Sequence, residues 1–224
     1  MFVSKSMTRT VITIDKEADL SEATEKMTTH RIRHLPVVDQ DRRLIGMITD
    51  RDIRSAMPSK YLHAEDGSKE PDLSSLRVKD VMTRELVVVS PMHTLQDALL
   101  LIQKTRVGAL PVVDENRVLR GILSIRDLVR AFINVLGIGE PGTLLCILVE
   151  EKVGQMKKIV DAITEENISF GSILVARYWD EGKRAVFPYL LTQNVRRVKK
   201  KLEKLGFELL DPMEWSLDQL PKNK

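Results

Sequence analysis

Two stretches of the chain place a hydroxyl and a carboxylate at the same spacing, each directly after an apolar run. They are residues 46–52 and 121–127, which hold Thr49, Arg51 and Asp52 and then Ser124, Arg126 and Asp127. A hydroxyl at a strand end and an acid three residues later would lie on one side of a following helix's first turn. Such a carboxylate accepts two hydrogen bonds at once, as the vicinal hydroxyls of a ribose would offer. The hydroxyl, the arginine and the helix N-terminus all favour phosphate, so the pattern indicates nucleotide chemistry.

Helix capping is the alternative explanation of each stretch. Serine, threonine and aspartate are common N-cap residues, and a cap alone would account for one such motif. The two stretches, however, belong to a longer repeat, because residues 7–56 align with 82–131 without a gap and 17 of the 50 pairs are identical. The same spacing on two matched scaffolds makes capping alone the weaker explanation.

Each repeat reads as strand, helix, strand, strand, helix. In the first repeat, residues 11–14 form a short β-branched strand, Asp19 caps a helix, and apolar strands follow at 35–38 and 44–48. In the second repeat Thr94 takes the capping position. The last helix of the second repeat is expected to bury a set of apolar side chains, namely Leu128, Val129, Phe132, Ile133 and Leu136. Residues 58–77, rich in charges and with two prolines, are expected to be a linker.

The pattern changes after residue 142, where the repeat does not recur. Strands are expected at 143–149, 168–178, 183–191 and 207–210, with one helix at 155–167 and a second one capped by Asn194. The order βαββαβ over 143–211 is that of a ferredoxin-like domain, and 212–224 is a tail. The basic run 196–201 is interpreted as the solvent-exposed face of the second helix, because apolar residues recur there at helical spacing. Binding of nucleic acid through this run is the weaker interpretation.

Composition points to a soluble globular protein, with 43% hydrophobic and 30% charged residues and a net charge of +3. No apolar run approaches the roughly 18 residues that suggest a membrane span, and the N-terminus holds no signal core, so a cytoplasmic protein is expected. The single Cys146 cannot form an internal disulfide, which fits a reducing compartment. The four histidines lack metal-ligand spacing, and no catalytic set is evident, so neither a catalytic cofactor nor an enzyme is expected.

On these motifs the chain resembles a known family. Residues 7–57 and 78–133 resemble two CBS motifs in the tandem arrangement called a Bateman module, through Met-Thr-Arg, Leu-Pro-Val-Val-Asp and Gly-x-x-Thr/Ser-x-Arg-Asp. Residues 143–211 resemble an ACT domain, through the βαββαβ order and the turn at 151–155. The order CBS–CBS–ACT is similar to that of AcuB-type acetoin-utilisation proteins. The resemblance implies an α/β (α+β) fold, in which CBS motif 1 (1–57) and CBS motif 2 (78–137) pack as a pseudo-two-fold pair.

The CBS resemblance also implies an adenosine nucleotide, AMP, ADP or ATP, as a regulatory ligand in clefts between the paired motifs. Carried over by position, the first site comprises Thr10, Val11, Ile32, Arg33, His34, Pro36, Thr49, Arg51 and Asp52. The second comprises Glu85, Leu86, Val107, Gly108, Ala109, Pro111, Ser124, Arg126 and Asp127. Arg33 and His34 match Gly108 and Ala109, so the first site should prefer more phosphate charge if those side chains face the cleft. The alternative is that they point to solvent.

The ACT resemblance implies a small metabolite at the turn that holds Glu151, Lys152, Gly154 and Gln155, where Val153 replaces the proline common in that family. The chain is therefore expected to be a homodimeric, non-enzymatic regulator that senses nucleotides and acts on an enzyme or another protein partner, with no nucleic acid or membrane involved. The alternative is a homodimerising interaction module whose ligand sites are degenerate.

Overall fold

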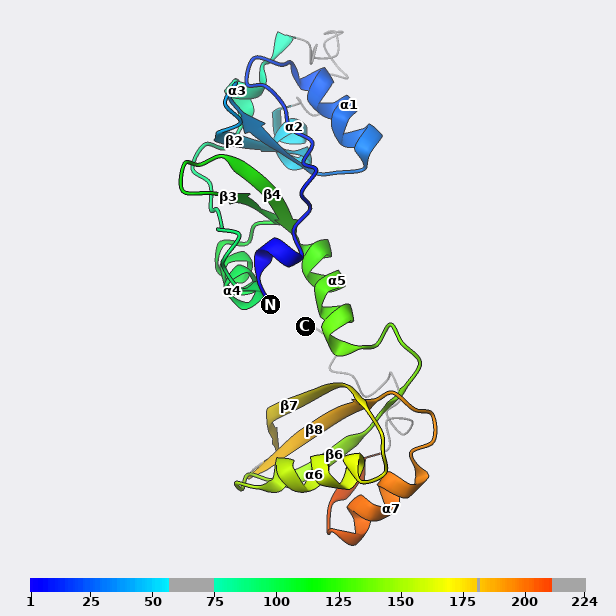
Figure 1. Cartoon of the computed structure of the whole chain (residues 1–224). Helices are drawn as coiled ribbons and strands as arrows, with labels where there is room; N and C mark the ends of the chain where they lie inside the picture. Colours follow the sequence, from blue (N-terminus) through cyan, green and yellow to red (C-terminus); the bar gives the residue numbers. More distant parts are fainter. Residues whose placement is uncertain (57–74, 181, 211–224) are drawn as a thin grey trace, which may run out of the picture. The chain divides into compact units, whose positions relative to one another are not determined.

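The computed structural model describes residues 1–56, 75–180 and 182–210 of the 224-residue chain. The chain forms two compact units, Met1–Val129 and Arg130–Lys224 (Figure 1). Most of the expected linker at 58–77 and the tail at 212–224 lie outside the described residues.

The first unit contains both repeats. The first repeat consists of a short helix η1 (Val3–Lys5), α1 (Leu20–His30), β1 (His34–Val38), β2 (Leu44–Thr49) and α2 (Asp50–Ala56). The second consists of α3 (Val78–Val81), α4 (Leu95–Thr105), β3 (Ala109–Val113), β4 (Leu119–Ser124) and α5 (Ile125–Leu136), which runs on into the second unit. Each repeat is a mixed α/β motif, as the sequence predicted.

The caps expected from the sequence are present. The Asp19 carboxylate accepts a hydrogen bond from the Glu22 amide at 2.8 Å at the start of α1. Thr94 starts α4 in a complete capping box with Asp97, in which each side chain bonds to the other residue's amide. Behind the Asp19 cap, the helix buries Leu20 and Ala23 in the core of the first motif.

The two hairpins explain the repeated Leu-Pro-Val-Val-Asp segment. β1 pairs with β2 and β3 with β4, both antiparallel and both with a register irregularity before the last valine of the segment. The aspartate that follows closes the turn, because Asp39 accepts from the amide of Arg43 at 2.8 Å and Asp114 from that of Val118 at 2.9 Å. The hairpins then bond to each other at their tips.

The strand predicted at 11–14 does not form, which is a correction. Only Ile14 makes a bridge, a parallel one to Val37, with bonds from Ile14 N to Pro36 O and from Val38 N to Ile14 O. Pro36 has no N–H to donate to the preceding carbonyl, so the ladder cannot extend toward residue 12. The second repeat behaves in the same way, with one bridge from Val89 to Val112 beside Pro111.

The segment that opens each repeat crosses to the other repeat. Met47 and Thr83 exchange two backbone hydrogen bonds of 2.9 Å, and Thr8 and Ile122 exchange bonds of 2.9 and 3.0 Å. Gly46 and Gly121 make this crossing possible. A Cβ on Gly46 would lie 2.5 Å from the sulfur of Met82, and one on Gly121 would lie 2.6 Å from that of Met7. The repeated Met-Thr and Gly residues are therefore explained by packing between the motifs.

Helix α5 differs from the prediction. Leu128 is buried, but Val129, Phe132 and Ile133 are exposed. The first unit ends within this helix, at Val129, and Leu136 near the end of the helix is half-buried.

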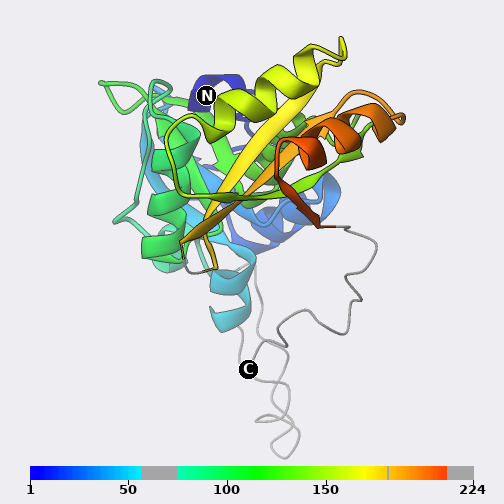
Figure 2. The ribbon, with the colours of Figure 1, turned by 90° about the horizontal axis from the view of Figure 1, so that it is seen from below.

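The second unit is an antiparallel sheet with two helices. Its elements are β5 (Thr143–Leu144), β6 (Cys146–Glu150), α6 (Gln155–Thr164), β7 (Phe170–Asp180), β8 (Lys183–Leu190), α7 (Arg196–Lys204) and β9 (Glu208–Leu210). β8 pairs with β5, β6 and β7, and β6 also pairs with β9. The helices lie side by side and share one apolar core with the sheet (Figure 2).

Two details of α7 bear on the sequence analysis. Val198 and Leu202 are buried while Arg196, Arg197 and Lys200 are exposed, so the basic run is a solvated helix face. Asn194 does not cap the helix, because the N-cap is Val195, which makes no side-chain capping bond. The backbone N–H of Asn194 instead donates a hydrogen bond to the Thr192 hydroxyl.

Candidate functional site

A cavity of about 530 Å³ lies between the two motifs of the first unit. This volume falls within the range of small-molecule sites. Five stretches of the chain line it, and their residues are Arg33, His34, Met47, Thr49, Asp50, Arg51, Asp52, Arg54, Thr83, Glu85, Leu86, Val87, Arg106, Val107, Gly108, Ala109, Pro111 and Ile125.

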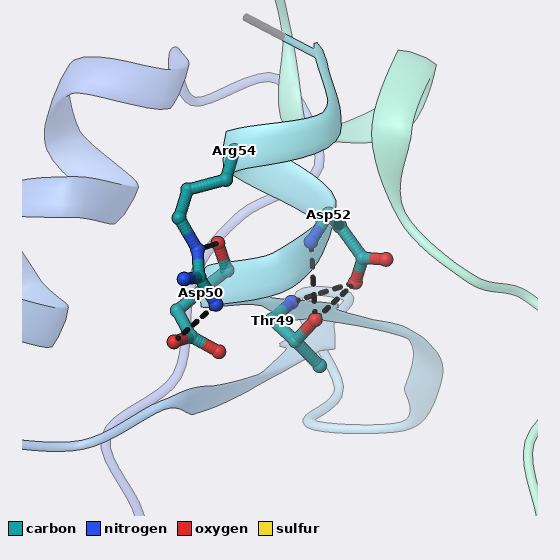
Figure 3. Close-up of polar contacts among 4 residues, drawn as sticks. All are labelled: Thr49, Asp50, Asp52 and Arg54. Atoms are coloured by element: carbon teal, nitrogen blue, oxygen red, sulfur yellow. Dashed lines mark hydrogen bonds and ion pairs between the residues drawn. The ribbon is translucent and has the colours of Figure 1, made fainter.

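Thr49 and Asp52 form a closed hydrogen-bond set at this cavity (Figure 3). Oδ2 of Asp52 accepts from the Thr49 amide at 2.8 Å and from the Thr49 hydroxyl at 2.7 Å. The Asp52 amide donates back to the Thr49 oxygen at 3.2 Å. Figure 3 shows the other carboxylate oxygen, Oδ1, pointing away from Thr49, and among the described residues no donor bonds to it. Capping is thus real here, but it occupies only one of the two oxygens.

Ser124 and Asp127 repeat the arrangement. Oδ2 of Asp127 accepts from the Ser124 amide at 2.9 Å and from its hydroxyl at 2.6 Å. The Thr8 hydroxyl lies 3.4 Å from Oδ1 of the same carboxylate, which is buried. Thr8, in the opening segment of the first motif, therefore contacts Asp127 of the second motif.

The structure groups the expected site residues across the motifs rather than within them. Of the first expected site, the cavity is lined by Arg33, His34, Thr49, Arg51 and Asp52, but not by Thr10, Val11, Ile32 or Pro36. Of the second, it is lined by Glu85, Leu86, Val107, Gly108, Ala109 and Pro111, but not by Ser124, Arg126 or Asp127. This grouping follows from the crossing of the opening segments. The opening segment of the second motif reaches the first motif, where Thr83 pairs with Met47, two residues before Thr49 on β2.

His34 and Gly108 meet in this cavity, although they come from adjacent positions of the two repeats. A Cβ on Gly108 would lie 2.7 Å from Nε2 of His34. The sequence analysis assigned Arg33 and His34 to one cleft and Gly108 and Ala109 to the other. In the structure all four residues line the same cavity. Burial lowers the pKa of His34 below its ordinary 6.5, and Arg33 acts in the same direction, while Asp50 and Asp52 oppose the shift.

Sequence analysis missed Asp50, Arg54 and Arg106. Arg54 pairs with Asp50 through an ion pair of 3.1 Å, and its Nε donates to the Asp50 carbonyl at the same distance (Figure 3). The signal was available, since an acid and an arginine four residues apart on a helix are neighbours. The Arg54 side chain is 70% exposed, and an exposed pair of this kind contributes only about 0.2–1 kcal/mol.

The charged side chains of the turn at 151–155 in the second unit form ion pairs with residues outside the turn. Glu151 pairs with Arg184, and Lys152 pairs with Glu150 at 2.5 Å. Gly154 has φ of 92°, and a Cβ added there would meet nothing within 4 Å, so this position needs glycine for its backbone conformation. Gln155 is the first residue of α6.

Other chemistry is sparse in the part of the chain that the structure describes. No cluster of three metal-binding side chains occurs there, and no helix there is long and apolar enough to cross a membrane. Cys146 is buried, and this burial raises the pKa of its thiol.

The family model of the CBS domain matches residues 3–59 and 78–134, which together make up half of the chain. The chain belongs to the CBS-domain family. A CBS domain-containing protein of Dictyostelium discoideum is 32% identical over 136 residues, covering 61% of this chain and 94% of that protein. The inosine-5'-monophosphate dehydrogenase of Methanocaldococcus jannaschii is 36% identical over 120 residues, covering 54% of this chain but only 21% of the enzyme.

Solved structures of CBS-domain proteins resemble part of this chain. A candidate acetoin utilization protein (AcuB) from Vibrio cholerae is 29% identical with a TM-score of 0.52, covering 63% of this chain and 98% of that one. The CBS domain pair of protein MJ0100, in complex with 5'-methylthioadenosine and S-adenosyl-L-methionine, is 26% identical with a TM-score of 0.49 and covers 59% of this chain and 95% of that one.

Proposed function

We propose that the CBS pair of this chain binds an adenosine nucleotide, AMP, ADP or ATP, and that the chain is a regulator without catalytic activity of its own. The observation that carries the proposal is the Asp52 carboxylate at the cavity. One of its oxygens is held by Thr49, and the other has no donor among the described residues. A carboxylate fixed in this way is preorganised to accept a ribose hydroxyl.

The rest of the cavity supports the same ligand. Arg33, Arg51 and Arg106 provide cationic donors for phosphate, while Leu86, Val107 and Pro111 provide apolar surface for a base. We extend the proposal to a second cleft related by the repeat, formed by Ser124, Arg126 and Asp127 with Thr10, Val11, Ile32 and Pro36. The contact of Thr8 with Asp127 supports that pairing.

Beyond the nucleotide, we propose that residues 143–211 form a ferredoxin-like ACT domain. The order β6–α6–β7–β8–α7–β9 and the all-antiparallel pairing support it. A small metabolite at Glu151, Lys152, Gly154 and Gln155 belongs to this proposal, as do a homodimer, a cytoplasmic location and a role in acetoin utilisation. The likeness to the AcuB candidate supports the last of these.

Calorimetric titration of the whole chain with AMP, ADP, ATP and S-adenosylmethionine tests the nucleotide proposal. Saturable binding of at least one adenosine ligand is expected. If none binds at millimolar concentration, the competing account of a homodimerising module with degenerate sites replaces it. The exposed apolar side of α5 is the observation that favours that second account.

A further inference from the structure

A second cavity of about 310 Å³ lies in the first motif, between α1 and α2. Its lining residues are Thr24, Met27, Thr28, Ile32, Arg33, Asp50, Ile53 and Arg54. Arg33, Asp50 and Arg54 line this cavity and the nucleotide cavity alike, so the two spaces adjoin at these three side chains.

The polar groups of the second cavity suit an anion. The hydroxyl protons of Thr24 and Thr28 are already donated to helix carbonyls, at 2.7 and 2.9 Å. The available donors are therefore the two guanidinium groups. Arg54 is largely exposed and bonds only to Asp50 in the contacts described above, and a guanidinium carries five N–H donors. Arg54 can therefore keep its contact with Asp50, or give it up, and still donate hydrogen bonds to two oxygens of a phosphate.

The repeat supplies an internal comparison. The residues 75 positions later are Leu99 for Thr24, Gln103 for Thr28, Gly108 for Arg33, Ile125 for Asp50 and Val129 for Arg54. No cation remains at these places in the second motif, and Ile125 and Val129 are exposed there. The positive charge at these positions is therefore a property of the first motif alone.

We propose that the cavity between α1 and α2 is a subsite for the terminal phosphates of a nucleotide, with Arg54 and Arg33 as its cationic donors. This inference rests on the proposed nucleotide function and adds its phosphate selectivity. Thr49 and Asp52, the proposed ribose contacts, lie on one side of the first turn of α2, and Arg54 lies over Asp50 on the other side (Figure 3). A monophosphate ends before Arg54, whereas a triphosphate chain passes between Arg33 and Arg54 into the subsite.

Calorimetric titrations with adenosine, AMP and ATP of the wild type, Arg54→Gln and Arg43→Gln test the subsite. Arg43 is an exposed hairpin arginine that lines neither cavity, so its replacement makes the same change in net charge. Arg54→Gln should weaken ATP at one class of site on the order of tenfold, the loss expected for one hydrogen bond to a charged group. It should leave adenosine and AMP within about twofold, and Arg43→Gln should change none of the three.

The outcomes separate the two claims. If Arg54→Gln weakens AMP and ATP alike, or if Arg43→Gln weakens ATP as much as Arg54→Gln does, the subsite is wrong and the nucleotide site stands. If the folded wild type binds none of the three ligands, the proposed function fails and the subsite fails with it. Thermal melting of each variant checks that it is folded.

Discussion

The imidazole ring of His34 occupies the space where a side chain at position 108 would stand. A Cβ on Gly108 would lie 2.7 Å from Nε2 and 2.9 Å from Cε1 of this ring. The two residues come from different motifs and both line the proposed nucleotide cavity. His34 of one motif thus packs against a glycine of the other, so the CBS pair is asymmetric where the ligand is proposed to bind.

This contact predicts a coupling between the two positions. Gly108→Ala should displace the His34 ring and lower the free energy of unfolding by about 1 kcal/mol, the lower end for an overpacked site, because the ring can rotate. Most of that loss should disappear in a His34→Ala background. Urea unfolding of the four proteins measures the coupling, which should be about 0.5–1 kcal/mol. Additive effects of the two substitutions would show that the contact does not exist in solution.

The glycines at the crossing points should be less tolerant. Gly46→Ala places a methyl group against Met82 and 3.2 Å from the Thr83 carbonyl, and Gly121→Ala does the same at Met7 and the Thr8 carbonyl, at 3.0 Å. Because backbone atoms cannot move aside cheaply, each should lose about 1–3 kcal/mol of unfolding free energy. Gly139→Ala is the matched control, with nothing within 4 Å, and should change stability by less than about 0.5 kcal/mol. Chemical denaturation compares them, and a loss at Gly139 equal to that at Gly46 would contradict the assignment.

Much of the fold follows from local sequence. The hairpins at 34–49 and 109–124 and the caps at Asp19 and Thr94 are confirmed, because apolar runs, turn residues and capping side chains act over a few positions. The missing strand at 11–14 depends instead on a proline in its partner strand, Pro36. The exposed side of α5 depends on where the unit ends, which helical periodicity does not show.

The grouping of the site is harder to read from the sequence for a physical reason. The two repeats offer matched binding surfaces, so the segment at 7–12 could pair with its own motif or with the other one, and local sequence is the same for both. The structure shows the exchanged pairing, in which Met82 packs against Gly46 and Met7 packs against Gly121. Arg54 gives no signal through recurrence, because the second repeat holds Val129 at the matching position.

Stability should depend on pH through His34. Because its pKa in the folded chain is lowered below 6.5, mainly by burial, the unfolded chain binds more protons as the pH falls through that value. The free energy of unfolding should therefore fall on acidification through about pH 6.5 and level off below the folded pKa. The free energy of unfolding of the His34→Asn variant should change less over the same pH range. Urea midpoints at several pH values for both proteins measure this, and equal slopes would show that His34 does not cause the effect.

The exposed apolar side of α5 predicts association of two chains. Val129 and Ile133 lie one turn apart on this helix and are both exposed. Covering such a surface in a two-fold dimer removes it from water. Light scattering of the whole chain at tens of micromolar should give the mass of two chains, and Ile133→Glu should shift it toward one. A wild-type mass of one chain would rule out the dimer.

The account depends most on Asp52 being a ligand group and not only a cap. Asp52→Asn keeps an oxygen that can accept from Thr49 but presents an amide where the carboxylate would accept a ribose hydroxyl. Asp97→Asn makes the same change in the capping box of α4, where Asp97 accepts from the Thr94 amide at 2.9 Å and from its hydroxyl at 2.7 Å, away from the cavity.

Calorimetric titration of the wild type, Asp52→Asn and Asp97→Asn with the tightest-binding nucleotide, alongside their thermal melting, is the most direct measurement. Asp52→Asn should lose roughly ten- to a hundredfold in affinity at one class of site, as expected for a hydrogen bond to a charged group worth about 1.5–3 kcal/mol. Asp97→Asn should bind as the wild type does, with a similar small loss of apo stability. Equal affinities in all three proteins would contradict the nucleotide site at Asp52 and leave this carboxylate as a helix cap.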